Sequence, residues 1–391
     1  MFRGCTSIET IPTIPVLSST NTAIEYYPEC FYGMFANCTK LRTQNFVIQG
    51  QFSKRSCYEM FSGCTSFISL SNITIDNYIT DPNDREARMD ECFKNMFTNC
   101  TTLVKGNDPI IIDFSHGAST YGNSVCESMF AGCTALDSEP IIYAGPSSSS
   151  KSFGKYCFYN MYNGCISMDS NITEFTITPN TITNTHTIYG GTFSEGCFRE
   201  MYTNCTSLTS PLNIMGGTIG NYCCCEMYKG CTSLTTVPTI VVASSLGDHA
   251  FDSAFTTCIG LSTVTSNSYF TAGSVGAYCF YRAFKNCKLL TTMPPLNINS
   301  YGDHACEEMF MSSGISDIGI SLNKATTVGK FSFYSMFEDC TSLTSLDNAI
   351  IPGAYINYQI VTEDDLTAPG EEYPMYHYVI DDVDYNAFYG I

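Results

Sequence analysis

The chain has 391 residues, enough for one elongated unit or for two or three domains. Lysine and arginine number 18 against 37 aspartate and glutamate, and the resulting net charge of −19 excludes a general nucleic-acid-binding role. Only 14% of the residues are charged and 44% are hydrophobic, a balance typical of a folded protein with a neutral polar surface.

The start of the chain carries no visible export signal. Residues Met1 to Cys5 lack the apolar region of a signal peptide, and no window approaches 18 consecutive apolar residues. We therefore expect neither a signal peptide nor a membrane span in the chain as given. Met1 already occupies the anchor position of the repeat described next, so either residues are missing ahead of it or a partner subunit covers that end.

One short motif recurs along the chain and organises it. The copy at Met129 reads MFAGCTAL, and the eleven intervals between the anchors at Met1 and Met336 average about 30 residues. An aromatic residue follows the anchor in all twelve copies, and a cysteine lies four residues after it in eleven; Ser313 replaces that cysteine in one copy. The anchors are Met1, Met34, Met60, Met96, Met129, Met161, Met201, Met227, Ala254, Ala283, Met309 and Met336.

Each repeat predicts a short helix followed by a short strand. Cys157, Met161 and Cys165 are spaced i, i+4, i+8, which predicts the buried stripe of a helix of two to three turns. After the second cysteine the apolar period changes to two or three, as in Leu234 to Ile240, which predicts a strand. A glycine seven residues before the anchor suits a turn into the helix, at Gly122, Gly154, Gly220, Gly247, Gly276, Gly302 and Gly329.

A helix-plus-strand unit of this length cannot bury its apolar side alone, so successive copies must stack. The sequence predicts an α+β repeat solenoid of about twelve coils over residues 1–350, with a parallel strand ladder on one side and short helices on the other. We expect the core repeat positions to be Met34, Cys38, Met60, Cys64, Met96, Cys100, Met129, Cys133, Met161, Cys165, Met201, Cys205, Met227, Cys231, Cys258, Cys287, Met336 and Cys340.

The spacing of Phe130, Cys133 and Leu136 resembles the BspA-like, or Treponema-type, leucine-rich repeat. The variant with methionine first is similar to arrays in surface proteins of gut bacteria and in proteins of their phages. The resemblance covers roughly residues 1–350 and implies a right-handed leucine-rich-repeat-like stack. It implies adhesion, host-surface recognition or a structural role alike, because function does not follow from the fold.

The twenty-two cysteines invite a disulfide or metal interpretation, which their spacing opposes. They recur singly at helical positions, and partners seven or eight residues apart on a helix lie about 11 Å apart, beyond disulfide reach. We expect buried, reduced thiols that act as small hydrophobic groups. Pairing between neighbouring copies stays open, as does a local thiol or metal site at Cys223, Cys224 and Cys225 with Cys231.

The chain lacks the motifs of the common enzyme classes, so we expect no enzyme, cofactor or metal site. His249 and His304 stand where other copies have Tyr156, Tyr222 and Tyr278, which favours packing over catalysis; the other histidines are His116, His186 and His377. Asp381, Asp382 and Asp384 lack the ligand pattern of an EF-hand and indicate a solvated acidic tail.

Two regions depart from the regular repeat. The intervals are longest between Met60 and Met201, which predicts loop insertions within residues 70–195, either as a binding side or as neutral growth. Residues 351–391 hold eight acids and no lysine or arginine, and we expect an acidic C-terminal cap or assembly segment. Its tyrosines suit an interface, the candidates being Tyr373, Tyr376, Tyr378, Tyr385 and Tyr389.

The first functional hypothesis is a non-enzymatic solenoid at a cell or virion surface that binds a protein or glycan ligand of a host or matrix. The alternative is an assembly protein of a phage particle or an extracellular fibre, which would dock end to end through its solenoid ends. A third class is an enzyme that uses the cluster at Cys223 to Cys225.

Overall fold

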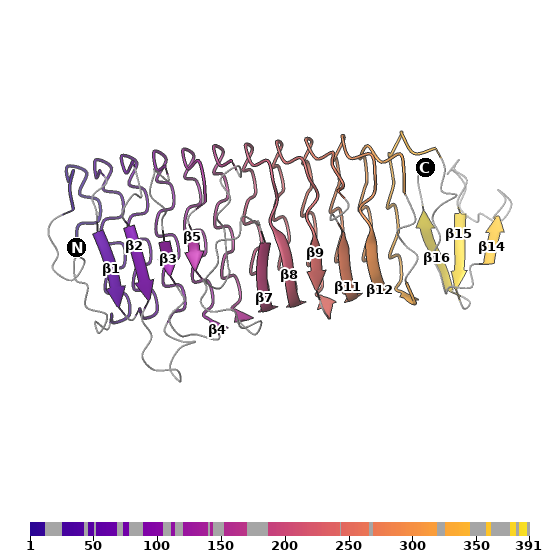
Figure 1. The fold of residues 1–391 in the computed structure, drawn as a ribbon, viewed down its shortest axis with the longest axis horizontal. Helices are drawn as coiled ribbons and strands as arrows, with labels where there is room; N and C mark the ends of the chain where they lie inside the picture. The colour runs from indigo at the N-terminus through magenta and orange to yellow at the C-terminus, as the bar shows by residue number, and fades with distance from the viewer. Residues whose placement is uncertain are drawn as a thin grey trace, which may run out of the picture.

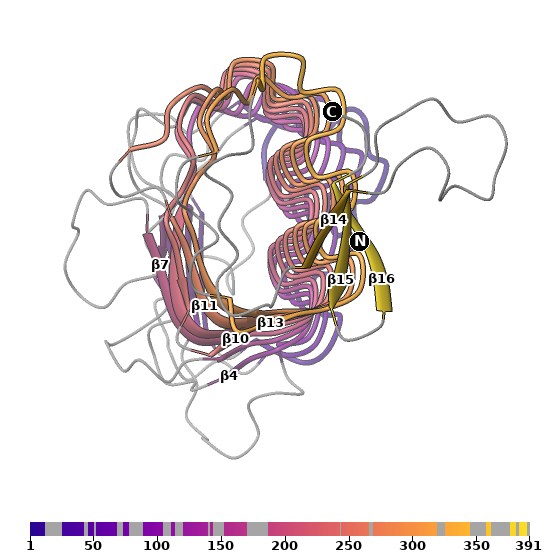
Figure 2. The same cartoon turned by 90° about the vertical axis from the view of Figure 1, so that its right-hand side faces the viewer.

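The computed structural model shows a parallel β-solenoid, whose coils follow one another along the long axis in chain order (Figure 1). Viewed along that axis, strands line one side and the underside of each coil, and a stack of tight turns forms the opposite side (Figure 2). We call these the strand face and the turn face. The structure describes residues 1–11, 26–42, 46–50, 52–68, 73–77, 89–104, 111–113, 120–139, 141–143, 152–169, 187–242, 244–265, 269–318, 325–344, 357–360, 376–380 and 383–388.

Two parallel sheets form the strand face. The first has the order β1-β2-β3-β5, with β1 (Phe46–Gly50), β2 (Ile73–Asn77), β3 (Ile111–Asp113) and β5 (Ile141–Tyr143). The second has the order β13-β12-β11-β10-β8-β7-β6-β4, with β9 paired to β8 and β11. Its strands are β4 (Thr120–Tyr121), β6 (Ser152–Phe153), β7 (Thr187–Phe193), β8 (Asn213–Ile219), β9 (Ile240–Val242), β10 (Ser245–Leu246), β11 (Phe270–Val275), β12 (Leu296–Tyr301) and β13 (Thr327–Val328).

Alternate strand residues point into the core, and equivalent residues of neighbouring coils lie in register. Ile214 pairs with Ile240, Ile240 with Phe270, and Phe270 with Leu296, and all four side chains are buried. The apolar residues after the second cysteine of each repeat therefore fill one wall of the core.

The predicted short helices are wrong: the described residues contain no helix. Every fourth residue of the turn face has a left-handed backbone, as in Tyr156, Asn160 and Gly164 with φ of 56°, 58° and 75°. Backbone N–H groups donate alternately to the carbonyl three residues back and to the next coil, as for Met161 N to Phe158 O at 3.3 Å and Tyr162 N to Met201 O at 2.8 Å. The four-residue period of these turns buries the i, i+4, i+8 stripe just as a helix would.

The glycines before the turns have a different role from the one expected. Gly220, Gly247, Gly276, Gly302 and Gly329, here called the corner glycines, are not in the left-handed region. A Cβ on Gly302 would lie 2.7 Å from the carbonyl carbon of Gly276 and 2.8 Å from Ala277 N. These positions lack a side chain because the backbones of neighbouring coils touch there.

An unbroken stack of aromatic rings runs through the core and links the residues that follow the anchors. Neighbouring ring centroids lie 4.9–5.8 Å apart with interplanar angles of 2–20°. This core ring stack consists of Phe2, Phe35, Phe61, Phe97, Phe130, Tyr162, Tyr202, Tyr228, Phe255, Phe284, Phe310 and Phe337.

The anchors and the second cysteines flank this stack and are buried. Met34 is the most exposed of the core repeat positions, at 8%. The others are Cys38, Met60, Cys64, Met96, Cys100, Met129, Cys133, Met161, Cys165, Met201, Cys205, Met227, Cys231, Cys258, Cys287, Met336 and Cys340, at 0–5%.

The parallel arrangement ends at the C-terminal segment. There β14 (Asn357–Ile360), β15 (Tyr376–Ile380) and β16 (Val383–Phe388) form a separate antiparallel sheet. Tyr376 and Tyr378 lie in β15 and Tyr385 in β16, whereas Tyr373, Tyr389 and the acids Asp381 and Asp382 lie outside the described residues. Most of the expected loop insertions within residues 70–195 also lie outside them.

Candidate functional site

All twenty-two cysteines are unbridged, and all except Cys5 and Cys30 are buried. The second cysteine of a repeat is more than the small hydrophobic group expected, because its thiol also donates a hydrogen bond to the carbonyl of the core ring residue one coil earlier. Cys165 Sγ lies 3.2 Å from Phe130 O, and Cys258 Sγ lies 3.0 Å from Tyr228 O. The same bond is made by Cys38, Cys64, Cys100, Cys133, Cys205, Cys231, Cys287 and Cys340.

Burial makes these thiols unreactive. It raises the pKa of Cys64, Cys133 and Cys258 to about 12, so they stay protonated at pH 8, and only a thiolate attacks alkylating reagents. We expect iodoacetamide at pH 8 to label Cys5 first, and Cys30, whose pKa burial raises to about 11, more slowly. Intact mass spectrometry would count the labels. Uniform rapid labelling of the folded protein would contradict this burial.

The cluster at Cys223 to Cys225 is internal. Cys223 and Cys224 are 0% exposed. Burial raises the pKa of Cys197 and Cys224, whereas at Cys223 burial is outweighed by hydrogen bonds from the thiols of these two neighbours, which lower its pKa. Burial also raises the pKa of Cys225 to about 12. All three thiols are buried among core side chains and away from solvent, so they fit core packing.

A second stack of rings lies on the turn face and is partly exposed. It consists of Tyr222, His249, Tyr278, His304 and Phe331, and we call it the ring ridge. Neighbouring centroids are 4.6–5.1 Å apart. The two histidines thus replace tyrosine in one packed row, as their shared register indicates.

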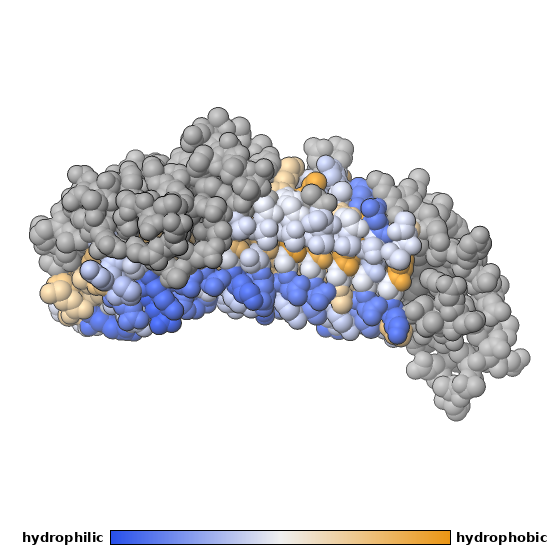
Figure 3. Space-filling view, turned by 90° about the horizontal axis from the view of Figure 1, so that it is seen from below, coloured by the Kyte–Doolittle hydropathy of each residue, from blue (hydrophilic) through white to orange (hydrophobic). Residues whose placement is uncertain are grey.

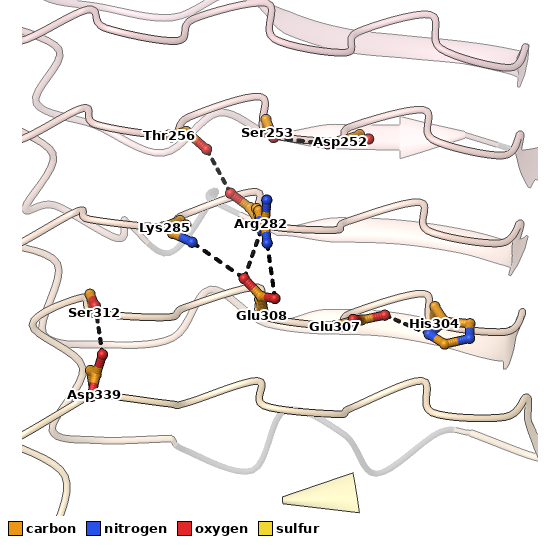
Figure 4. A network of polar contacts seen from close by, with 10 residues as sticks. All are labelled: Asp252, Ser253, Thr256, Arg282, Lys285, His304, Glu307, Glu308, Ser312 and Asp339. Carbon is orange, nitrogen blue, oxygen red and sulfur yellow. Dashed lines mark hydrogen bonds and ion pairs between the residues drawn. The ribbon is translucent and has the colours of Figure 1, made fainter. Parts of the chain in front are cut away.

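Each histidine of the ring ridge contacts an acidic side chain of its own turn. His249 Nδ1 lies 2.9 Å from Asp252 Oδ2, and His304 Nδ1 contacts Glu307 Oε2 (Figure 4). Each imidazole therefore has a ring on either side and a carboxylate at its edge. This arrangement orients the ring and leaves part of its edge toward solvent.

Ion pairs join neighbouring coils beside the ridge. Arg282 donates to both carboxylate oxygens of Glu308, at 2.7 and 3.1 Å, and Lys285 lies 3.3 Å from Glu308 Oε2 (Figure 4). Burial alone would raise the pKa of Glu308, but the two cations outweigh it and lower that pKa. Such partly exposed pairs add little stability, so we regard them chiefly as surface features.

Arginines also lie against tyrosines along the turn face. The guanidinium of Arg282 is 4.5 Å from the ring centroid of Tyr281, and that of Arg199 is 5.9 Å from the rings of both Tyr159 and Tyr222. Tyrosine and arginine are the side chains that most often dominate binding energy at protein interfaces. The ring ridge and its flanking arginines form the candidate protein-binding surface.

A polar cluster is buried where the core ring stack changes from phenylalanine to tyrosine. Tyr202 Oη donates to Glu139 Oε1 at 2.6 Å, although Glu139 is only 3% exposed. Burial and the charge of Glu139 raise the pKa of Tyr202 far above its usual range. The cluster was not predicted, because 63 residues separate the two partners.

Tyr202→Phe should lower the free energy of unfolding by about 1–3 kcal/mol, because the buried hydrogen bond from Tyr202 Oη to Glu139 Oε1 is lost. Tyr162→Phe is the matched control, since Tyr162 Oη is buried without a hydrogen-bond partner among the described residues. We expect the control to be neutral or slightly stabilising. Chemical denaturation of both variants would measure the difference, and equal losses would contradict the role of the bond.

Neither a metal site nor a membrane helix is found in the part of the chain that the structure describes. No group of three or more histidine, cysteine or acidic side chains there could hold a metal ion. None of its elements is a helix long and apolar enough to cross a membrane.

Comparisons with known proteins identify no family. No protein-family model matches the chain, and no curated protein matches it. Among solved structures, a leucine-rich cell surface protein from Faecalibacterium prausnitzii is similar over 61% of this chain and 66% of its own, just under two thirds, at 16% sequence identity. The TM-score of 0.25 is too low for the likeness to carry an argument about fold or function. The solenoid is therefore described from its own strand pairing and core.

Proposed function

We propose that this protein is a non-enzymatic solenoid of the cell surface that mediates adhesion or recognition of a host or matrix ligand. The observation that supports this best is the ring ridge, a continuous row of partly exposed rings held rigidly by coil stacking. Its stacked rings can bury apolar area with little further loss of conformational freedom on binding, and the flanking arginines add charged hydrogen-bond donors.

We also propose the finer architecture of about twelve coils, one for each anchor, of the BspA-like type. The core ring stack supports the number, because it passes through the residue after every anchor from Phe2 to Phe337. The motif of anchor, aromatic and cysteine supports the type.

The absence of catalysis is likewise part of the proposal. The burial of the thiols supports it, since Cys223 and Cys224 are 0% exposed and Cys225 is 6% exposed. The histidines support it through their packing in the ring ridge. The alternative, an assembly protein of a phage particle or fibre, receives no support from the comparisons.

The double variant Tyr222→Ala and Tyr278→Ala tests the proposal. Retention of the purified chain would be measured on fixed epithelial cells and on wells coated with mucin or collagen. We expect the wild-type chain to bind at least one of these surfaces and the double variant to bind it at least about tenfold less, as for loss of hot-spot side chains.

Ser207→Ala with Ser233→Ala, two small changes outside the ring ridge and outside the strands, is the control and should bind as the wild-type chain does. Equal thermal unfolding midpoints would show that the ridge variant is folded. Absence of wild-type binding to every surface would overturn the proposed function.

A further inference from the structure

The strand face differs from the rest of the molecule in carrying no charge over five successive coils. Residues 187–193, 209–219, 235–246, 263–275 and 291–301 contain no aspartate, glutamate, lysine, arginine or histidine, although the chain has a net charge of −19. The ion pairs of these coils lie on the turn face: Arg199 with Glu200, Lys229 with Glu226, and Arg282 and Lys285 with Glu308. The charges are thus segregated to one side of the solenoid.

A row of hydroxyl groups runs along this uncharged face. Strand pairing places Thr192 beside Thr218, Ser245 beside Ser274, Ser274 beside Ser300, and Ser300 beside Thr327. The side chains are partly or fully exposed and follow the strand spacing of about 4.8 Å. This hydroxyl row consists of Ser152, Thr192, Thr218, Ser245, Ser274, Ser300 and Thr327.

Uncharged side chains continue the surface beside the hydroxyl row. Met215, Val241, Thr271 and Asn297 are mutually in register and partly exposed. Figure 3, seen from below, shows a band of pale residues of near-neutral hydropathy, with a row of hydrophobic residues between it and a stripe of strongly hydrophilic ones. The band therefore offers hydroxyl donors and acceptors at regular intervals, with small apolar patches beside them.

We propose that the hydroxyl row binds a neutral polysaccharide. A sugar polymer presents hydroxyl groups and C–H patches at regular intervals, which matches both rows, and it has no charge that would require a counter-charge on the protein. Many weak contacts along a rigid row strengthen the overall binding, because the first contact holds the rest of the polymer at a high effective concentration near the row. The inference rests on the proposed recognition function and names a second partner for a different face.

Other partners fit this face less well. A nucleic acid or an anionic polysaccharide would need lysine or arginine, which these strand segments lack. A protein partner would be expected to use arginine anchors among others, and the arginine–tyrosine contacts lie on the turn face, whereas these strand segments contain no arginine. The absence of charge and the regular hydroxyl spacing together favour the neutral polymer.

Sedimentation with insoluble polysaccharide tests the inference. The intact chain would be mixed with microcrystalline cellulose or chitin as neutral probes, and with calcium alginate gel as an anionic one. We expect it to sediment with at least one neutral probe and to stay in solution with alginate. The double variant Thr218→Lys and Ser274→Lys, which places charge and bulk in the row, should sediment at least tenfold less.

Ser207→Lys with Ser233→Lys is the matched control, because it adds the same charge at surface positions outside the strands. The control should sediment like the wild-type chain, and circular dichroism should show that both variants are folded. No sedimentation with either neutral probe, or equal losses in the two variants, would overturn the inference. Continued binding to cells, mucin or collagen in that case would leave the proposed function intact.

Discussion

Gly276→Ala is expected to lower the free energy of unfolding by about 3 kcal/mol or more, the upper range for overpacking a tight core. A Cβ at this corner glycine would lie 2.6 Å from Asp248 N and 2.7 Å from the carbonyl carbon of Gly247. These are backbone atoms that cannot turn aside as a flexible side chain would. The two coils would have to separate locally, which would weaken the hydrogen bonds and ring contacts between them.

Gly164→Ala is the control, measured by chemical denaturation alongside Gly276→Ala. Gly164 has φ of 75°, but a Cβ there would have nothing closer than 3.9 Å, so only the left-handed backbone penalty of about 1 kcal/mol is expected. A loss for Gly276→Ala no greater than for Gly164→Ala would show that the coils do not touch at the corner glycines.

Met161→Ala is expected to lower the free energy of unfolding by about 2–5 kcal/mol, as for other truncations of a large core side chain. The side chain is 0% exposed and belongs to the same core cluster as the rings of Phe158 and Tyr162. Its removal leaves a cavity that the stacked coils cannot close. Met161→Leu, which keeps most of the volume, should lose less than about 1.5 kcal/mol.

Two natural copies with alanine at the anchor show how such a loss can be offset. Ala254 and Ala283 are buried in the same row, and the ring of Phe270 lies edge-on to rings of the same two repeats, 5.9 Å from the Phe251 ring and 5.3 Å from the Phe280 ring. We infer that Phe270 fills the volume that methionine fills elsewhere. A measured loss near zero for Met161→Ala would mean that its surroundings can collapse without such a ring.

The core could be predicted from the sequence because burial depends on period, and the period was read correctly. The buried stripe alone does not distinguish a helix from tandem four-residue turns. Over eight residues, a period of 3.6 residues and a period of four residues place nearly the same side chains on the buried side. The glycine or asparagine just before the second cysteine was the signal that would have separated them. Gly132, Gly230, Asn99 and Asn204 all have φ between 60° and 77°, a backbone that a helix interior excludes.

The candidate surfaces were only partly predictable. The shared register of His249 with Tyr222 and Tyr278 indicated a packing position, but not that the rings form an exposed row. The hydroxyl row depends on strand register across intervals of unequal length, which a single sequence does not fix.

The alternating hydrogen bonds of the turn face all run in one direction. Each N–H that leaves a coil, such as that of Phe158, points to the coil that follows, and each carbonyl that accepts, such as that of Cys197, points back. The peptide dipoles of this face therefore add along the rod and make its two directions electrically unequal. A duplicated coil can therefore be inserted only in the orientation of its neighbours. In that orientation, an in-frame duplication lengthens the molecule and requires no new kind of contact between coils.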